Sequence, residues 1–116
     1  MQLNFSSDGD ALTIALQSRI THATLDIGND PLVAHNPDIY KRRVLFDLSG
    51  VDYVDSSGVS WLLTCHKRFR EAGGKLVLHS ATPLVMQVIR VLKLDQVFAI
   101  ADTARAARDQ TSEVTA

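Results

Sequence analysis

Hydrophobic and polar residues alternate with a period of two along the first part of the chain. Residues 3–6 form one alternating stretch and residues 11–17 form a second. An Asp-Gly-Asp turn at residues 8–10 separates the two stretches. Alternation on both sides of an Asp-Gly pair is typical of two strands joined by a tight turn. The pattern therefore predicts an antiparallel hairpin over residues 3–17.

After residue 43, apolar runs of strand length take turns with stretches of helical periodicity. The apolar runs predict three strands, at residues 44–48, 75–79 and 97–100. The first run, V-L-F-D-L, is apolar at four of its five positions and suits a central strand that is buried on both faces.

Three stretches carry the signals of helices, at residues 57–71, 83–93 and 102–108. The apolar face predicted for the first helix consists of Val59, Leu62, Leu63, His66 and Phe69. The face predicted for the second consists of Leu84, Val85, Val88, Ile89 and Leu92. The end signals are Gly73-Gly74 after the first helix, Thr82-Pro83 before the second and Asp102 before the third.

Strands that alternate with helices indicate parallel crossovers. The predicted fold class is therefore α/β, with a small mixed sheet of about four or five strands built from the hairpin and the crossovers. Residues 21–43 have the weakest pattern, because Pro31 and Pro37 interrupt any long helix. This segment has room for a short helix, near Thr24 or between Pro31 and His35.

The composition describes an ordinary globular domain. The 116 residues of 12.7 kDa predict one domain over residues 1–110, followed by a polar tail at residues 111–116. A net charge of −1 without a basic stripe argues against nucleic-acid binding. The polar amino end lacks a secretory signal, and no apolar stretch reaches the roughly 20 residues that cross a bilayer, so we expect no membrane insertion. A single cysteine, Cys65, fits a reducing compartment, and we expect a cytoplasmic protein.

The candidate chemistry lies at residues 52–59, D-Y-V-D-S-S-G-V, between the predicted central strand and the first long helix. Open α/β sheets place ligand sites at this end of their strands. A serine at a helix N-terminus lies beside unpaired amides and the positive end of the helix dipole, which would stabilise a phosphate on its hydroxyl. The commoner role is capping, in which Ser56 or Ser57 bonds a first-turn amide. Spacing alone leaves both interpretations open.

At this point the sequence resembles a STAS domain, the fold of bacterial anti-sigma factor antagonists. The resemblance covers residues 43–108 and depends on four blocks in order. They are V-L-F-D-L-S-G-V at residues 44–51, D-S-S-G at residues 55–58, A-G-G-K-L-V-L at residues 72–78, and the stretch from Thr82-Pro83 to Val97-Phe98.

The resemblance implies a binding module that phosphorylation switches. In regulatory members of the family, an anti-sigma factor that is a serine protein kinase phosphorylates the second serine of D-S-S-G, which matches Ser57. The unphosphorylated form would bind the anti-sigma factor and free a sigma factor for transcription, and a PP2C-type phosphatase would reset the switch. Besides Ser57, the expected partner-binding residues are Asp55, Ser56, Gly58, which would admit close approach of the partner, and Trp61. No cofactor or metal is implied.

The chain departs from the family in the stretch Ser18-Arg19-Ile20-Thr21, where members often carry Gly-x-Leu/Ile-Asp. Ser18 stands in place of the glycine and Thr21 in place of the aspartate that lies near the phosphorylated serine. This departure favours an alternative function, a non-switching STAS subunit that acts as a structural scaffold or as a cytoplasmic accessory component of a transporter.

For three further residues, more than one role is possible. Trp61 either anchors an interface or packs under residues 21–43. Cys65 is a small core residue rather than a reactive thiol. A serine hydrolase built on Ser57 would need the G-x-S-x-G turn and an oxyanion loop, and the sequence has neither, so we expect no enzyme. The four histidines share no metal-ligand spacing.

Overall fold

The computed structural model of the chain describes residues 2–9, 11–25 and 29–112. A sheet of five strands in the order β1-β2-β3-β4-β5 forms its centre. The strands are β1 (Gln2–Asp8), β2 (Ala11–Ile20), β3 (Arg43–Val54), β4 (Lys75–His79) and β5 (Ala99–Ala101). β1 pairs antiparallel with β2, and the other neighbours are parallel. The predicted mixed α/β sheet with its N-terminal hairpin is confirmed.

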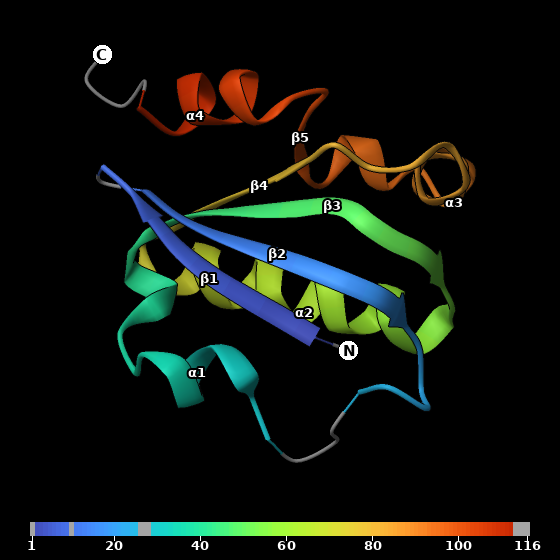
Figure 1. Cartoon of the computed structure of the whole chain (residues 1–116), viewed down its shortest axis with the longest axis horizontal. Coiled ribbons are helices and arrows are strands. Elements are labelled where there is room, and N and C mark those ends of the chain that lie inside the picture. The colour runs from blue at the N-terminus through green and yellow to red at the C-terminus, as the bar shows by residue number, and fades with distance from the viewer. Residues whose placement is uncertain (1, 10, 26–28, 113–116) are drawn as a thin grey trace.

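Helices cover both faces of this sheet. They are α1 (Pro31–His35), α2 (Ser56–Ala72), α3 (Pro83–Val91) and α4 (Ala104–Ser112), with single 3-10 turns η1 (Ile39–Lys41) and η2 (Leu94–Gln96). Figure 1 shows α1 and α2 on one side of the sheet and α4 on the other. The short helix α1 occupies Pro31–His35, one of the two places at which the sequence allowed a short helix.

The main core lies between the sheet and α2. Alternate residues of neighbouring strands, such as Ile14, Phe46 and Leu78, are fully buried there and stand side by side in the register. The opposite face carries a smaller core under α4, with Leu45 and Val77 at its centre. The middle strand is therefore buried on both faces, as its apolar run predicts.

The predicted end of the central strand at residue 48 is wrong, because β3 continues to Val54. Two further core positions, Val51 and Val54, hold the extension in place, and β2 pairs along it through two register shifts. One shift lies at Ser18, whose φ of +76° places it in the left-handed region. This is the conformation that glycine adopts without strain, and Ser18 adopts it although its side chain disfavours it.

The predicted apolar face of the helix at residues 83–93 is partly wrong. Val85 and Ile89 are buried, but Leu84 and Leu92 are 48% and 52% exposed, and the helix ends at Val91. The buried stripe of α2 likewise runs through Cys65 rather than His66. Thr82 caps α3 as predicted, since its hydroxyl accepts the Val85 amide at 3.4 Å.

The carboxyl end also differs from the sequence expectation. The last strand begins at Ala99, two residues late, because η2 occupies the preceding segment. The hydroxyl of Thr103, rather than Asp102, accepts the first-turn amide of Ala106 at 3.1 Å. Thr111 is buried inside α4, so the helix extends past the predicted start of the tail, and residues 113–116 of that tail lie outside the described residues.

Candidate functional site

Asp55 fixes the start of α2 and ties it to the end of β2. Its Oδ1 accepts the amide hydrogen of Gly58 at 2.9 Å, and its Oδ2 accepts the amide hydrogen of His22 at 3.0 Å. The bonds from His22 and then Gly58 hold the pKa of the Asp55 carboxyl below its ordinary value. Asp55 is therefore the helix cap, and neither Ser56 nor Ser57 has the capping role that the sequence left open.

Gly58 is buried where β2 and α2 meet. A Cβ atom on this residue would lie 2.0 Å from the carbonyl oxygen of Ile20 and 2.9 Å from Cγ1 of Val54. The space that a side chain on Gly58 would need is thus filled by the backbone of Ile20 and the side chain of Val54. The expectation that Gly58 admits close approach of a partner is corrected, because the group that approaches it is the end of β2.

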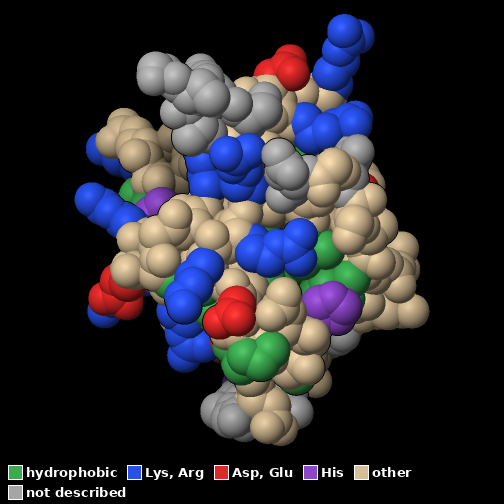
Figure 2. All heavy atoms as spheres, turned by 90° about the vertical axis from the view of Figure 1, so that its left-hand side faces the viewer, with side chains coloured by type: hydrophobic (Ala, Val, Ile, Leu, Met, Phe, Trp, Pro, Cys, Tyr) green, Lys and Arg blue, Asp and Glu red, His purple; other side chains and the backbone are tan. Residues whose placement is uncertain are grey.

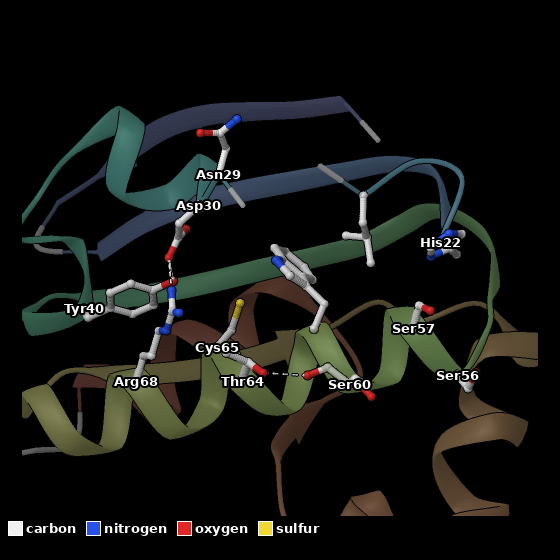
Figure 3. A pocket seen from close by; sticks show the side chains of 12 residues that line it. His22, Asn29, Asp30, Tyr40, Ser56, Ser57, Ser60, Thr64, Cys65 and Arg68 are labelled. Carbon is white, nitrogen blue, oxygen red and sulfur yellow. Dashed lines mark hydrogen bonds and ion pairs between the residues drawn. The ribbon is translucent and has the colours of Figure 1, made fainter. Parts of the chain in front are cut away.

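Ser57 is half-buried in the first turn of α2, and Ser56 before it is exposed. Within the described part of the chain, the Ser57 hydroxyl has no hydrogen-bond partner, since Asp55 already serves the first-turn amide of Gly58. Figure 3 shows this hydroxyl on the side of α2 that faces His22. The hydroxyl is held in place by its helix and remains chemically uncommitted.

Ser57 lines a cavity of about 510 Å³ that runs along α2 under the segment between β2 and α1. Three more α2 side chains at helical spacing, Ser60, Trp61 and Thr64, form the floor of this cavity. His22 and Leu25 line it from the opposite side. The half-buried Ser57 side chain therefore borders the space of this cavity.

An ionic cluster closes the other end of the cavity. One carboxylate oxygen of Asp30 caps α1 by accepting the Leu32 amide at 2.9 Å. The other accepts the Tyr40 hydroxyl at 2.6 Å and pairs with the Arg68 guanidinium (Figure 3). Burial, together with the bond to Asp30, raises the pKa of Tyr40, so this phenol remains a donor at any physiological pH. The cluster joins α1, η1 and α2.

The sequence did not point to Asp30, Tyr40 or Arg68 as part of this site. Arg68 belongs to the basic run of α2, which is usually solvated, and the other two lie in the segment whose pattern proline breaks. The Asp-Pro pair at residues 30–31, a helix-start signal, was the one available indication.

Trp61, for which the sequence left open an interface anchor or packing under residues 21–43, stacks on Phe46 of the sheet. Its ring lies 6.0 Å from that of Phe46, with the planes within 10° of parallel, so one side packs on the core. The residue is only partly buried and also lines the cavity. Cys65, by contrast, is 1% exposed, and burial raises the pKa of its thiol to about 12. Cys65 is thus a core residue, as expected for a free cysteine.

Thr21 takes the place of the family's aspartate without supplying a carboxylate. Its backbone amide donates to the Thr24 hydroxyl at 2.9 Å, and its carbonyl accepts the amide of Leu25 at 2.9 Å. The residue therefore builds a tight turn at the end of β2. Asp55, two residues before Ser57, does supply a carboxylate at the start of the same helix.

Neither a metal-binding cluster nor a membrane-spanning helix occurs in the described ranges. No group of three or more His, Cys, Asp or Glu side chains there is arranged to hold a metal ion. No helix of the described chain is both long enough and apolar enough to cross a membrane. Figure 2 shows the end of the molecule on the left of Figure 1, where Lys and Arg side chains are interspersed with acidic ones.

Comparison with known proteins agrees with this architecture. Residues 3–102 match the family described as "Mlab, STAS domain". A Bordetella bronchiseptica protein, BtrV, named as a candidate anti-sigma factor antagonist, is 30% identical over 107 residues, which are 92% of this chain and 91% of the relative.

Two solved structures share the fold at low identity. A candidate anti-sigma factor antagonist from Thermotoga maritima superposes with a TM-score of 0.76 and 18% identity, over 96% of this chain and 95% of that one. The Bacillus cell fate determinant SpoIIAA in its phosphorylated form superposes with a TM-score of 0.64 and 16% identity, over 94% and 98%. With the family match over most of its length and a relative at 30% identity, the chain belongs to the STAS domain family.

Proposed function

We propose that this anti-sigma factor antagonist-like domain is switched by phosphorylation of Ser57. In this proposal the kinase is a cognate anti-sigma factor, which binds the unphosphorylated domain and thereby frees a sigma factor for transcription. Phosphorylation breaks the complex, and a PP2C-type phosphatase restores the unmodified serine. The domain acts as a binding module in the cytoplasm and not as an enzyme.

The observation that carries the proposal is the state of the Ser57 hydroxyl. It is held on the first turn of a helix, has no partner among the described residues and opens into a cavity. Such a hydroxyl can attack the γ-phosphorus of ATP held by a docked kinase. The bond from that phosphorus to ADP breaks, and the hydroxyl proton leaves to a base or to solvent.

The phosphate would change the charge of the partner-facing surface. It adds a charge of about −1.5 to −2 at neutral pH. It would stand two residues from Asp55 at the start of the same helix, whose carboxylate is ionised and accepts two amide hydrogens. Two neighbouring anions repel an acidic or phosphate-bearing surface of the partner, and like charges at an interface cost several kcal/mol.

The proposed partner-binding residues divide into two groups. Ser56, Ser57 and Trp61 retain exposed surface and can touch a partner directly. Asp55 and Gly58 act through the chain by joining the first turn of α2 to the end of β2. Tryptophan is enriched among the residues that dominate binding energy, and Trp61 already lies one turn from Ser57.

The relatives support the same proposal. SpoIIAA has been solved in a phosphorylated form, so a protein of this fold accepts a phosphate. BtrV, the Bordetella relative, is named for antagonism of an anti-sigma factor. The block D-S-S-G stands at the start of α2 in this chain, where the family's phosphorylated serine is expected.

Binding calorimetry with charge variants tests the switch. The purified domain is titrated with each anti-sigma factor of its source organism that is a serine kinase, in the presence of ADP. Ser57→Asp should weaken the tightest complex at least about tenfold, because it places a carboxylate at the contact. Ser60→Asp adds the same charge three residues later on α2 and should weaken binding less. Equal affinity of Ser57→Asp and the unmodified domain would refute the switch.

The second candidate is a non-switching subunit, a scaffold or an accessory component of a transporter. The absence of an aspartate at position 21 favours it, since the amide and carbonyl groups of Thr21 form hydrogen bonds within a local turn. Purification of the tagged domain from its native cells separates the two candidates. A kinase-like anti-sigma factor in the eluate supports the switch, and a transporter ATPase or a large assembly of this chain supports the subunit.

A non-enzymatic role is tested by turnover of an activated ester. The domain should hydrolyse p-nitrophenyl acetate no faster than its Ser57→Ala variant does. A rate that depends on Ser57 would instead favour a serine hydrolase.

A further inference from the structure

The turn that follows β2 is firmly built. The Thr24 hydroxyl donates to the carbonyl oxygen of Arg19 at 2.7 Å, and the amides of Thr24 and Leu25 donate to the carbonyl oxygen of Thr21 at 3.0 and 2.9 Å. His22 lies inside this turn, and its own amide donates to Asp55. The position of the His22 backbone relative to α2 is thus fixed by the bond to the Asp55 carboxylate and by the turn itself, without use of the His22 side chain.

The side chain of His22 shares the cavity with Ser57. Both residues line it, and Figure 3 shows the imidazole above the first turn of α2, on the side to which the Ser57 hydroxyl points. The imidazole is exposed, so it exchanges protons freely with water. It also lies close enough to Asp55 that its protonated form stabilises the Asp55 carboxylate.

A phosphate on Ser57 would need a cation, because it would stand beside the Asp55 carboxylate. The other cations near the cavity or the end of β2 are engaged elsewhere. Arg19 faces Asp52 at 4.0 Å, and Arg68 pairs with Asp30 eleven residues further along α2, a rise of about 16 Å. Among the described residues, His22 is the cation-forming group that faces the first turn of α2.

We propose that the His22 side chain binds the phosphate group of phosphorylated Ser57 as its ion-pair partner. The imidazolium pairs with the phosphate oxygens and holds them over the first turn of α2, between the helix N-terminus and the turn after β2. The proton on the imidazole comes from solvent. This inference rests on the proposed phosphorylation of Ser57, and it makes the charge pairing of the phosphorylated state sensitive to pH where a serine phosphate titrates, about 6.

The test uses the full chain with phosphoserine placed at position 57 by genetic incorporation, so that no kinase is required. The titration midpoint of the phosphate is followed by ³¹P NMR in this protein and in a His22→Gln variant. The midpoint should be lower by about half a unit when His22 is present, a shift typical of an exposed ion pair. The midpoint of the His22 imidazole, followed by proton NMR, should rise on phosphorylation.

The variant and its control are matched. His22→Gln keeps the backbone amide that bonds Asp55, so the start of α2 should retain its structure, which amide NMR spectra of both proteins verify. His35→Gln removes the exposed histidine of α1, whose ring stacks on Phe5 at 3.8 Å, and should leave the phosphate midpoint unchanged.

Equal phosphate midpoints with and without His22 would overturn the inference. This result is independent of the proposed function, because the phosphate is installed without a kinase. If no kinase modifies Ser57 while the midpoints still differ, the proposed switch fails and the phosphate site stands.

Discussion

The carbonyl oxygen of Ile20 occupies the position that a side chain on Gly58 would need. A Cβ atom there would lie 2.0 Å from this oxygen, well inside van der Waals contact. The amide of Asp55 also donates to the same carbonyl at 3.3 Å. The end of β2 is therefore pressed onto the first turn of α2, and this contact holds Ser57 and His22 at one end of the cavity.

Gly58→Ala should destabilise the fold by about 3 kcal/mol. The added methyl group meets backbone, which cannot rotate away, and overpacking of this kind costs about 1 to 3 kcal/mol or more. Urea denaturation followed by circular dichroism measures the change in the free energy of unfolding.

A second glycine variant serves as the control for Gly58→Ala. Gly73 ends α2 with a φ of +91° and has open space around a Cβ atom, so Gly73→Ala costs only backbone strain, about 1 kcal/mol. If Gly58→Ala is no more damaging than Gly73→Ala, the close contact with Ile20 is not the constraint described above.

Asp55 should make the stability of the domain depend on pH in the acid range. Its folded pKa lies below its unfolded value, so its contribution is complete above about pH 4 and is lost as the pH falls through the folded pKa. Urea midpoints between pH 2.5 and 6 measure this loss. The Asp55→Asn variant keeps an oxygen acceptor for the cap but cannot ionise, so its curve should be flatter. Parallel curves for the two proteins would show that the carboxylate is not held in this way.

Tyr40 and Asp30 should be energetically coupled. Tyr40→Phe removes the hydrogen bond of 2.6 Å between them and should cost about 1 kcal/mol of folding free energy. In an Asp30→Ala background the same substitution should cost close to nothing, because its acceptor is gone. Tyr53→Phe, at a tyrosine that is 46% exposed, is the matched control and should have no effect. Additive losses in the double-mutant cycle would contradict the coupling.

Cys65 should be inert in the native domain. Its thiol is 1% exposed and its pKa is raised to about 12, so almost no thiolate is present at pH 8. Ellman's reagent should react with it only as fast as the protein opens, and immediately in 6 M guanidinium chloride. Cys65 also borders the cavity, and rapid reaction of the folded protein would show that the reagent reaches the sulfur from there.

The sequence predicted most of the fold because its signals are local. The period-two alternation before and after residues 8–10 gave the hairpin, and Thr82-Pro83 gave the start of α3. The central strand was predicted, but its continuation beyond residue 48 was missed because Ser49-Gly50 is typical of a turn, whereas Val51 and Val54 continue the core beyond it. Burial that depends on a neighbouring element leaves no local signal.

Only those features of the site that come from residues close together in the sequence could be predicted. Contacts between residues far apart in the sequence could not. The D-S-S-G block marked Ser57 at a helix start, but spacing could not assign the cap to Asp55, whose second partner is an amide 33 residues earlier. The same limit hid the cavity, which forms between α2 and a segment with no regular pattern. The sequence pattern predicts that Arg68 is a solvated cation on the helix surface, whereas in the fold it forms an ion pair with Asp30.

The most direct test of the central claim is the location of phosphate after a kinase reaction. The domain, its Ser57→Ala variant and its Ser60→Ala variant are incubated with ATP and each serine-kinase anti-sigma factor of the source organism, and tandem mass spectrometry maps the product. We expect a single phosphate on Ser57 in the unmodified domain and in Ser60→Ala, and none in Ser57→Ala. Kinases that are active on their own substrates but leave Ser57 unmodified, or that modify Ser57→Ala equally well, would contradict the account.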